Sequence, residues 1–301
     1  MLPRSVLSPV DFSEHSRHAL RWAGAFAARF QSRLTVISVV DPLLAEAARI
    51  RLGKDLAKAE TEPALRGFVA ATWSEGGARP PDQTVVKTTV GEPATAILET
   101  ARADAADLIV MGTQGLGGFR KWLLGSTTER LLRRTHVPVL AVPSPSSDSD
   151  VESQHQGFEI SHILAATDFS ESSVAAAQAA VELSMRWSAP LTLVHVLAPL
   201  KVPAQWQPLV QESEEMRVAS ARTALKTLAG QLCGTRVCED LVVLCHPAEM
   251  IGSIARDRGT QLVVMGLASE RGVFAPRPGS IAYRVLCSST VPVLVVPTSD
   301  K

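Results

Sequence analysis

The chain has 301 residues, about twice the length of a common single domain, so two domains are expected. Hydrophobic residues make up 46% and charged residues 20% of the sequence, and the mean hydropathy is +0.13, values typical of a soluble globular protein. Lysine plus arginine and aspartate plus glutamate each total 30, so no global charge favours nucleic acid or an anionic membrane as a partner.

The sequence carries no pattern of export or membrane insertion. Pro9, Asp11 and Ser13 interrupt any signal-peptide core, and no segment has the roughly 18 uninterrupted apolar residues of a spanning helix. The four cysteines, Cys233, Cys238, Cys245 and Cys287, include no Cys-x2-Cys pair, which argues against a disulfide framework or a zinc site. We therefore predict a cytoplasmic protein with buried, reduced thiols and no protein-bound metal.

In the first half of the chain, short β-branched runs alternate with helical patterns. The runs predict strands near residues 5–10, 34–40, 84–89, 107–111 and 138–142. After the first strand, apolar residues recur at helical spacing, at Ala19, Trp22, Ala23, Phe26 and Phe30. This alternation predicts an α/β, Rossmann-like fold: a five-stranded parallel sheet with helices on both faces. In such sheets a ligand binds where the strand order reverses, which directs attention to the loops after the first and fourth strands.

The loop after the fourth predicted strand carries a glycine pattern. It reads MGTQGLGGFRKWLLGSTTERLLRR, in which Gly112, Gly115 and Gly125 form G-x2-G-x9-G, closed by Ser126. Glycines let backbone N–H groups converge on phosphate oxygens. Ser126 with Glu129 predicts a capping box at a helix N-terminus, where an anion is favoured. The alternative is that the glycines only mark turns of a long loop and bind no ligand. Neither the Walker pattern nor the dinucleotide-binding pattern is present.

The sequence also repeats itself. SVLSPVDFSEHS at 5–16 matches HILAATDFSESS at 162–173, LIVMGTQG at 108–115 matches LVVMGLAS at 262–269, and HVPVLAVP at 136–143 matches TVPVLVVP at 290–297. A polar stretch at 144–157 separates the copies and is typical of a linker. We predict two tandem domains of the same fold, residues 1–146 and 158–301.

These segments resemble the universal stress protein family, specifically its tandem members and its ATP-binding branch. The resemblance covers nearly the whole chain and includes VLSPVDFSE at 6–14, VISVVD at 36–41, DLIVMGTQG at 107–115 and GSTTERLLRRTHVPVLAVP at 125–143. It implies two adenine nucleotide alpha hydrolase-like domains. It further implies a stress-response sensor or regulator that binds ATP, ADP or AMP, with Mg²⁺ bridging the phosphates.

The resemblance also implies which residues contact the nucleotide. Pro9, Val10 and Asp11 would hold the adenine, Val39 would border adenine and ribose, and Met111 and Gly112 would line the ribose, while Gly115, Gly125, Ser126 and Thr127 would hold phosphates. Gln114 stands where the family often has His or Arg. Asp11 has an alternative role in capping the following helix, next to Ser13 and Glu14. No residue is predicted to be catalytic.

The second copy keeps only part of this pattern. A possible second site would comprise Thr167, Asp168, Val196, Met265, Gly266, Ser269, Gly279 and Ser280. Ser269 replaces the middle glycine, Pro276 and Pro278 remove N–H donors, and Ser280 lacks a Glu partner because position 283 is a tyrosine. We expect weak nucleotide binding or none, and a pairing or regulatory role for this half.

Two other functions remain open from the sequence. One is a slow ATPase or phosphotransferase, although no placed catalytic base accompanies the loop residues Arg120 and Lys121. The other is a scaffold that has lost nucleotide binding and acts through dimerisation. The apolar strands at 138–142 and 292–296 would leave open sheet edges, so we predict that they pair in an intramolecular pseudo-dimer, with a homodimer as a further state.

Overall fold

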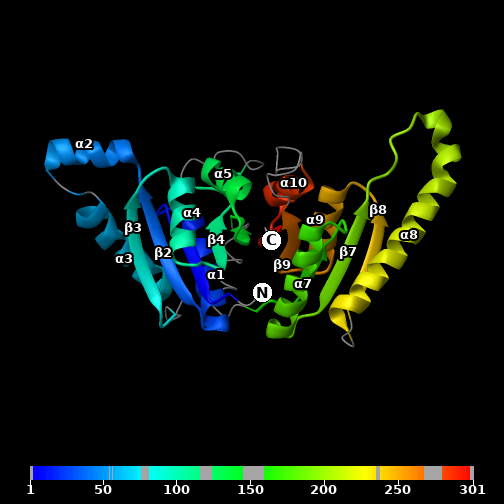
Figure 1. Ribbon diagram of the computed structural model, residues 1–301, viewed down its shortest axis with the longest axis horizontal. Coiled ribbons are helices and arrows are strands. Elements are labelled where there is room, and N and C mark those ends of the chain that lie inside the picture. Colours follow the sequence, from blue (N-terminus) through cyan, green and yellow to red (C-terminus); the bar gives the residue numbers. More distant parts are fainter. Residues whose placement is uncertain are drawn as a thin grey trace. The chain divides into compact units, whose positions relative to one another are not determined.

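The computed structural model describes residues 3–53, 55, 57–75, 81–115, 124–144, 159–234, 238–267 and 280–298. Contacts divide the chain into two compact units, Leu2–Phe158 and Glu159–Lys301, here called the N-terminal and C-terminal units. In each unit strands and helices alternate (Figure 1). The predicted fold class is confirmed for both units, and the domain limits 1–146 and 158–301 stay predictions.

Each unit contains a five-stranded parallel sheet. The strands of the N-terminal unit are β1 (Ser5–Pro9), β2 (Arg33–Val40), β3 (Thr84–Val90), β4 (Leu108–Gly112) and β5 (Val139–Val142), in the order β3-β2-β1-β4-β5. Those of the C-terminal unit are β6 (Ile163–Ala166), β7 (Leu191–Leu197), β8 (Glu239–Leu244), β9 (Leu262–Leu267) and β10 (Val293–Pro297), in the order β10-β9-β6-β7-β8. All five strands predicted for the first half are confirmed.

The connections between the strands are helical. In the N-terminal unit they are α1 (Glu14–Phe30), α2 (Pro42–Leu52), the short π-helical η1 (Ala57–Thr61), α3 (Glu62–Glu75), α4 (Pro93–Ala103) and α5 (Ser126–Arg134). In the C-terminal unit they are α7 (Glu171–Trp187), the 3₁₀ turn η2 (Ala204–Trp206), α8 (Gln207–Cys233), α9 (Pro247–Asp257) and α10 (Ile281–Ser288). Among the helices in these ranges, none combines the length and the apolar composition needed to cross a membrane.

The core lies between the sheet and its two helical layers. Leu7, Ile109 and Leu140, on β1, β4 and β5, are fully buried, and each such side chain contributes about 1.5–3 kcal/mol by leaving water. Helix α1 packs on β1 and β4 and against α3, whereas α4 packs on β2 and against α5. The predicted apolar face of α1 is buried except at its last residue, Phe30, which is partly exposed.

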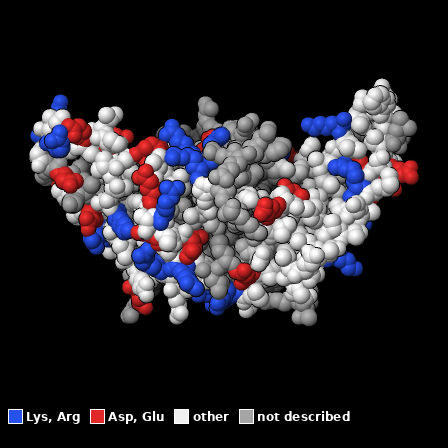
Figure 2. Space-filling view, in the orientation of Figure 1, with Lys and Arg blue, Asp and Glu red and all other residues white. Residues whose placement is uncertain are grey.

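Surface features agree with the composition. Charged side chains of both signs are interspersed over the face of the N-terminal unit in Figure 2, as the balanced charge leads us to expect. Helix α2 projects away from the sheet (Figure 1) and exposes 82% of Leu43 and 70% of Ile50. All four cysteines are free thiols, but only Cys233 is buried, so the prediction of buried thiols is wrong for the other three.

Candidate functional site

The predicted ligand edge of the N-terminal unit is a point where the strand order reverses. From β1 the chain passes to β2 on one side and later to β4 on the other, and Leu7 of β1 faces Ile109 of β4. The carboxyl ends of β1 and β4 are therefore neighbours. The segments that follow them, Val10–Ser13 and Thr113–Gly115, meet at this edge, where parallel α/β sheets bind ligands.

The turn from β1 into α1 is fixed by side-chain hydrogen bonds. Ser13 is the N-cap of α1, since its Oγ accepts from the Ser16 N–H at 3.1 Å. Asp11 Oδ1 accepts from the Ser13 N–H at 3.1 Å and from the Ser13 hydroxyl at 2.5 Å. Asp11 therefore does not cap the helix itself but holds the residue that does, so the capping alternative for Asp11 is only partly right.

Phe12, between Asp11 and Ser13, has a backbone conformation that the sequence analysis missed. Its φ is 64°, in the left-handed region, which is strained for a bulky side chain by about 1–3 kcal/mol. Its ring stacks edge-on against Phe68 of α3 at 5.6 Å, and the Arg17 guanidinium lies over that Phe68 ring at 4.4 Å. The repeated DFS sequence is the signal for this turn, because Phe169 in the second copy has a φ of 65°.

The three glycines of the loop lie close together, but they serve different purposes. A Cβ added to Gly115 would stand 2.6 Å from Asp11 Oδ2, and one added to Gly125 would stand 3.8 Å from the Gly115 nitrogen. A Cβ added to Gly112 would instead meet the protein's own backbone, 3.3 Å from the His15 carbonyl oxygen. Gly112 thus allows α1 to approach β4 closely, whereas Gly115 allows the Asp11 carboxylate to lie against the loop backbone.

The start of α5 corrects the predicted capping box. The N-cap is Gly125, which has no side chain to make a capping hydrogen bond, so Ser126 is the first residue of the helix rather than its cap. The Gly125 N–H donates to the Thr113 carbonyl at 2.8 Å and is thus already used within the fold. The first turn of α5 therefore presents backbone N–H groups without a side-chain cap, next to Gly115 and Asp11.

The other predicted contact residues occupy the same edge with varied exposure. Val10 and Met111 are 5% exposed, and the Val10 N–H donates to the Ile37 carbonyl, so these two residues contribute mainly to the core. Pro9, Val39, Gln114 and Thr127 are half-buried and Ser126 is exposed. Pro9 pairs with Ile37, which places Val39 beyond the end of β1. The loop's basic residues, Arg120 and Lys121, lie outside the described residues.

The C-terminal unit repeats the turn after its first strand but differs at the start of its last helix. Asp168 Oδ1 accepts from the Ser170 N–H at 3.0 Å and from its hydroxyl at 2.5 Å, and Ser170 caps α7. Helix α10, however, has its own cap, since Ser280 Oγ accepts from the Tyr283 N–H at 3.2 Å. Gly266 approaches the start of α7, where an added Cβ would stand 2.5 Å from the Ser173 nitrogen. Ser269 and Gly279 lie outside the described residues.

Comparison with known proteins decides the family. A model described as the universal stress protein family matches residues 3–143 and 159–297. The chain belongs to the universal stress protein family. A universal stress protein of Mycobacterium tuberculosis is 27% identical over 301 residues, covering 96% of this chain and 95% of the relative. One of Methanocaldococcus jannaschii is 34% identical over 151 residues, covering 49% of this chain and 86% of the relative. The crystal structure of a universal stress protein from Archaeoglobus fulgidus shares the fold over 98% of both chains, with a TM-score of 0.66 and 20% identity.

The two universal stress protein units also differ at the residues predicted to contact the adenine base. His195, which stands where the N-terminal unit has Ser38, places its Nδ1 2.7 Å from the Thr167 carbonyl oxygen, and its ring stacks on Phe169 at 4.6 Å. Burial raises the pKa of the Asp168 carboxyl, but hydrogen bonds from Ser170 and Ser173 lower it by more, so the pKa lies below its ordinary value. Asp168 is thus held as a carboxylate, and Val196, beyond His195, is half-buried.

Proposed function

We propose that the N-terminal unit binds an adenine nucleotide, with the phosphates at the N-terminus of α5 and the base beside Asp11. One observation carries this proposal: α5 begins without a side-chain cap, next to Gly115, at the point where the strand order reverses. A helix N-terminus with unsatisfied N–H groups stabilises an anion such as a phosphate. The nucleotide would be ATP, ADP or AMP.

In this proposal the residues divide between phosphates and base. The Gly115 backbone and the first turn of α5, with the Ser126 and Thr127 hydroxyls, would hold the phosphates. Asp11 would accept a hydrogen bond from the base, whose other side would lie against Val39. Gly112 and Gly125 would act indirectly, because one gives room to α1 and the other donates its N–H to Thr113.

Magnesium would enter with the nucleotide rather than bind beforehand. Among the residues that the structure describes, no group of three or more His, Cys, Asp or Glu side chains could hold a metal ion. Asp11 is the carboxylate that lies beside Gly115, and its Oδ1 is engaged by Ser13. When bound, Mg²⁺ would neutralise phosphate charge, and the phosphate oxygens would be its main ligands.

We further propose that nucleotide binding serves a regulatory role in the stress response rather than phosphoryl transfer. Transfer normally needs a positioned base and a clamp of cations around the phosphates. Asp11, which lies next to Gly115, is a carboxylate that could serve as a base, but its Oδ1 accepts hydrogen bonds from the Ser13 N–H and hydroxyl. The described side chains therefore support binding of the phosphates rather than their transfer. The C-terminal unit, in which Ser280 caps α10, would bind nucleotide weakly or not at all.

The terminal strands of the two units support a proposal about assembly. β5 and β10 each end their unit's strand order, and their sequences, VLAV and VLVVP, are apolar. Apolar edges left open promote aggregation. Pairing of the two edges within one chain would form a pseudo-dimer, and pairs of chains could form a homodimer.

Calorimetric titration with MgATP tests the nucleotide site. We expect one site per chain. We expect Gly115→Arg to weaken its affinity at least tenfold, about 1.4 kcal/mol, because an added Cβ would stand 2.6 Å from Asp11 Oδ2 and the new side chain would displace the Asp11 carboxylate. The matched control is Gly67→Arg, on the exposed face of α3, where an added Cβ meets nothing within 4 Å. Equal affinities in all three proteins would contradict the assigned loop, and no heat in the wild type would favour the scaffold alternative.

A further inference from the structure

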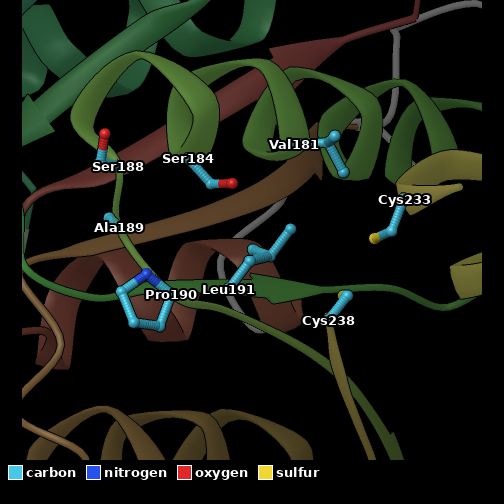
Figure 3. A pocket seen from close by; sticks show the side chains of 8 residues that line it. All are labelled: Val181, Ser184, Ser188, Ala189, Pro190, Leu191, Cys233 and Cys238. Carbon is cyan, nitrogen blue, oxygen red and sulfur yellow. The ribbon is translucent and has the colours of Figure 1, made fainter. Parts of the chain in front are cut away.

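A cavity in the C-terminal unit lies away from the edge described above. It has a volume of about 280 Å³ and is lined by Val181, Ser184, Ser188, Ala189, Pro190, Leu191, Cys233 and Cys238 (Figure 3). Leu191 is the first residue of β7, and Ser188 ends α7, so the cavity is at the amino end of the sheet. The nucleotide edge is at the carboxyl end, so this cavity needs a separate explanation.

Two cysteines from different elements meet in this cavity. Cys233 is the last residue of α8, and Cys238 directly precedes β8. Gly234, with a φ of 59°, turns the chain out of α8 between them. Cys233 is 9% exposed and Cys238 is partly exposed, and Figure 3 shows the Cys233 sulfur directed toward the cavity.

The surroundings of the Cys238 thiol favour its protonated form. Burial, together with a hydrogen bond to Cys233, raises the pKa of the Cys238 thiol to about 12. The Cys238 thiol donates to the Glu239 carbonyl oxygen at 3.8 Å, and both cysteines line the same cavity. Cys245 follows the other end of β8, about 20 Å from Cys238 at the rise of a strand, so it is no competitor for either sulfur.

We propose that Cys233 and Cys238 form a peroxide-reactive thiol pair that closes to a reversible disulfide. The Cys233 thiol loses its proton, its sulfur attacks one oxygen of hydrogen peroxide, and the O–O bond breaks. Cys233 becomes a sulfenic acid, and the hydroxide that leaves takes up the Cys233 proton as water. The Cys238 sulfur then attacks the Cys233 sulfur, the S–O bond breaks, and the departing hydroxide takes the Cys238 proton as water. Two thiols and one peroxide thus give one disulfide and two waters.

The two cysteines would act in a definite order. The Cys233 sulfur is directed toward the cavity, whereas the raised pKa of Cys238 keeps that thiol protonated at neutral pH, so we assign the reaction with peroxide to Cys233 and the resolving step to Cys238. The cavity admits a molecule as small as hydrogen peroxide to the Cys233 sulfur. The resulting bond would tie the end of α8 to the start of β8.

Peroxide treatment of the full-length chain tests the pair. We expect the free-thiol count, measured after unfolding, to fall from four to two and to return to four with a dithiol reductant. A tryptic digest without reductant should contain peptide 227–236 joined to peptide 237–256. Because the second peptide also holds Cys245, the Cys245→Ser variant should give the same cross-link.

Single variants separate the two roles. Cys238→Ser should stop at a sulfenic acid on Cys233 that dimedone labels, and Cys233→Ser should leave Cys238 unlabelled under the same treatment. A count that stays at four, loss of the cross-link in Cys245→Ser, or a disulfide between two chains would overturn the proposal. MgATP affinity plays no part in these readouts, so failure of the nucleotide site would leave them unchanged.

Discussion

Asp104, at the end of α4, is a buried carboxylate whose partners come from two strands. Its side chain is 9% exposed, and it accepts from Lys87 Nζ at 2.6 and 2.8 Å and from Thr35 Oγ1 at 3.2 Å. Burial raises the pKa of Asp104, but the hydrogen bond and charge of Lys87 and the bond from Thr35 lower it by more, so the pKa lies below its ordinary value. The ionised form is therefore stabilised by the fold.

Lys87→Met should lower the free energy of unfolding by about 1–3 kcal/mol at neutral pH, because the Asp104 carboxylate loses its hydrogen-bonded cation and retains the charge of Arg33. Since folding lowers the pKa of Asp104, this contribution is present above the unfolded-state pKa and is lost as the pH falls through the lower folded-state pKa. Urea unfolding at neutral and acid pH measures it, with the exposed Lys201→Met as control. A deficit that is equal at both pH values would contradict the ion-pair explanation.

The sequence predicts some of the residues at the carboxyl edge of the N-terminal sheet but not the role of others. Asp11, Gly115 and Gly125 could be placed together because each follows a recognisable buried strand or opens a helix. The role of Gly112 could not be predicted, since it depends on a close approach to the His15 backbone, which is nearly one hundred residues away along the chain. The positive φ of Phe12 has no local pattern beyond the repeated DFS, because bulky residues rarely adopt it.

At the scale of elements, the succession of strands and helices followed from the sequence, because strands buried on both faces are short apolar runs. The prediction of a capping box was wrong because the Ser-x-x-Glu pattern fits two helix starts. Ser126 can be the N-cap or the first residue of the helix. Only the backbone decides, and here Gly125 takes the cap position. The equivalent helix of the C-terminal unit is capped by Ser280, although it lacks the glutamate.

The two helix starts should respond differently to the loss of a hydroxyl. Ser280→Ala removes the acceptor of the Tyr283 N–H and should lower the free energy of unfolding by about 1 kcal/mol. Ser126→Ala removes no capping bond and should have less than half that effect. Chemical denaturation of both variants measures the difference. A Ser126→Ala variant as unstable as Ser280→Ala would show that Ser126 caps α5.

The whole molecule consists of two units with the same strand order and different helix starts. Both units keep what folding requires: the Asp-Phe-Ser turn, the N-cap of the first helix and a glycine at or next to the last residue of the fourth strand. The start of the last helix is not needed for the sheet, and there the units diverge. We therefore predict that a nucleotide would act on one unit, which would make the tandem chain functionally asymmetric.

Amide hydrogen exchange with saturating MgATP tests this asymmetry most directly, because it reports on the backbone N–H groups themselves. We predict slower exchange at Gly115 and at the first turn of α5, residues 126–128, and unchanged exchange at the start of α10, residues 281–283. Protection that appears at α10 but not at α5, or equal protection at both, would contradict the account.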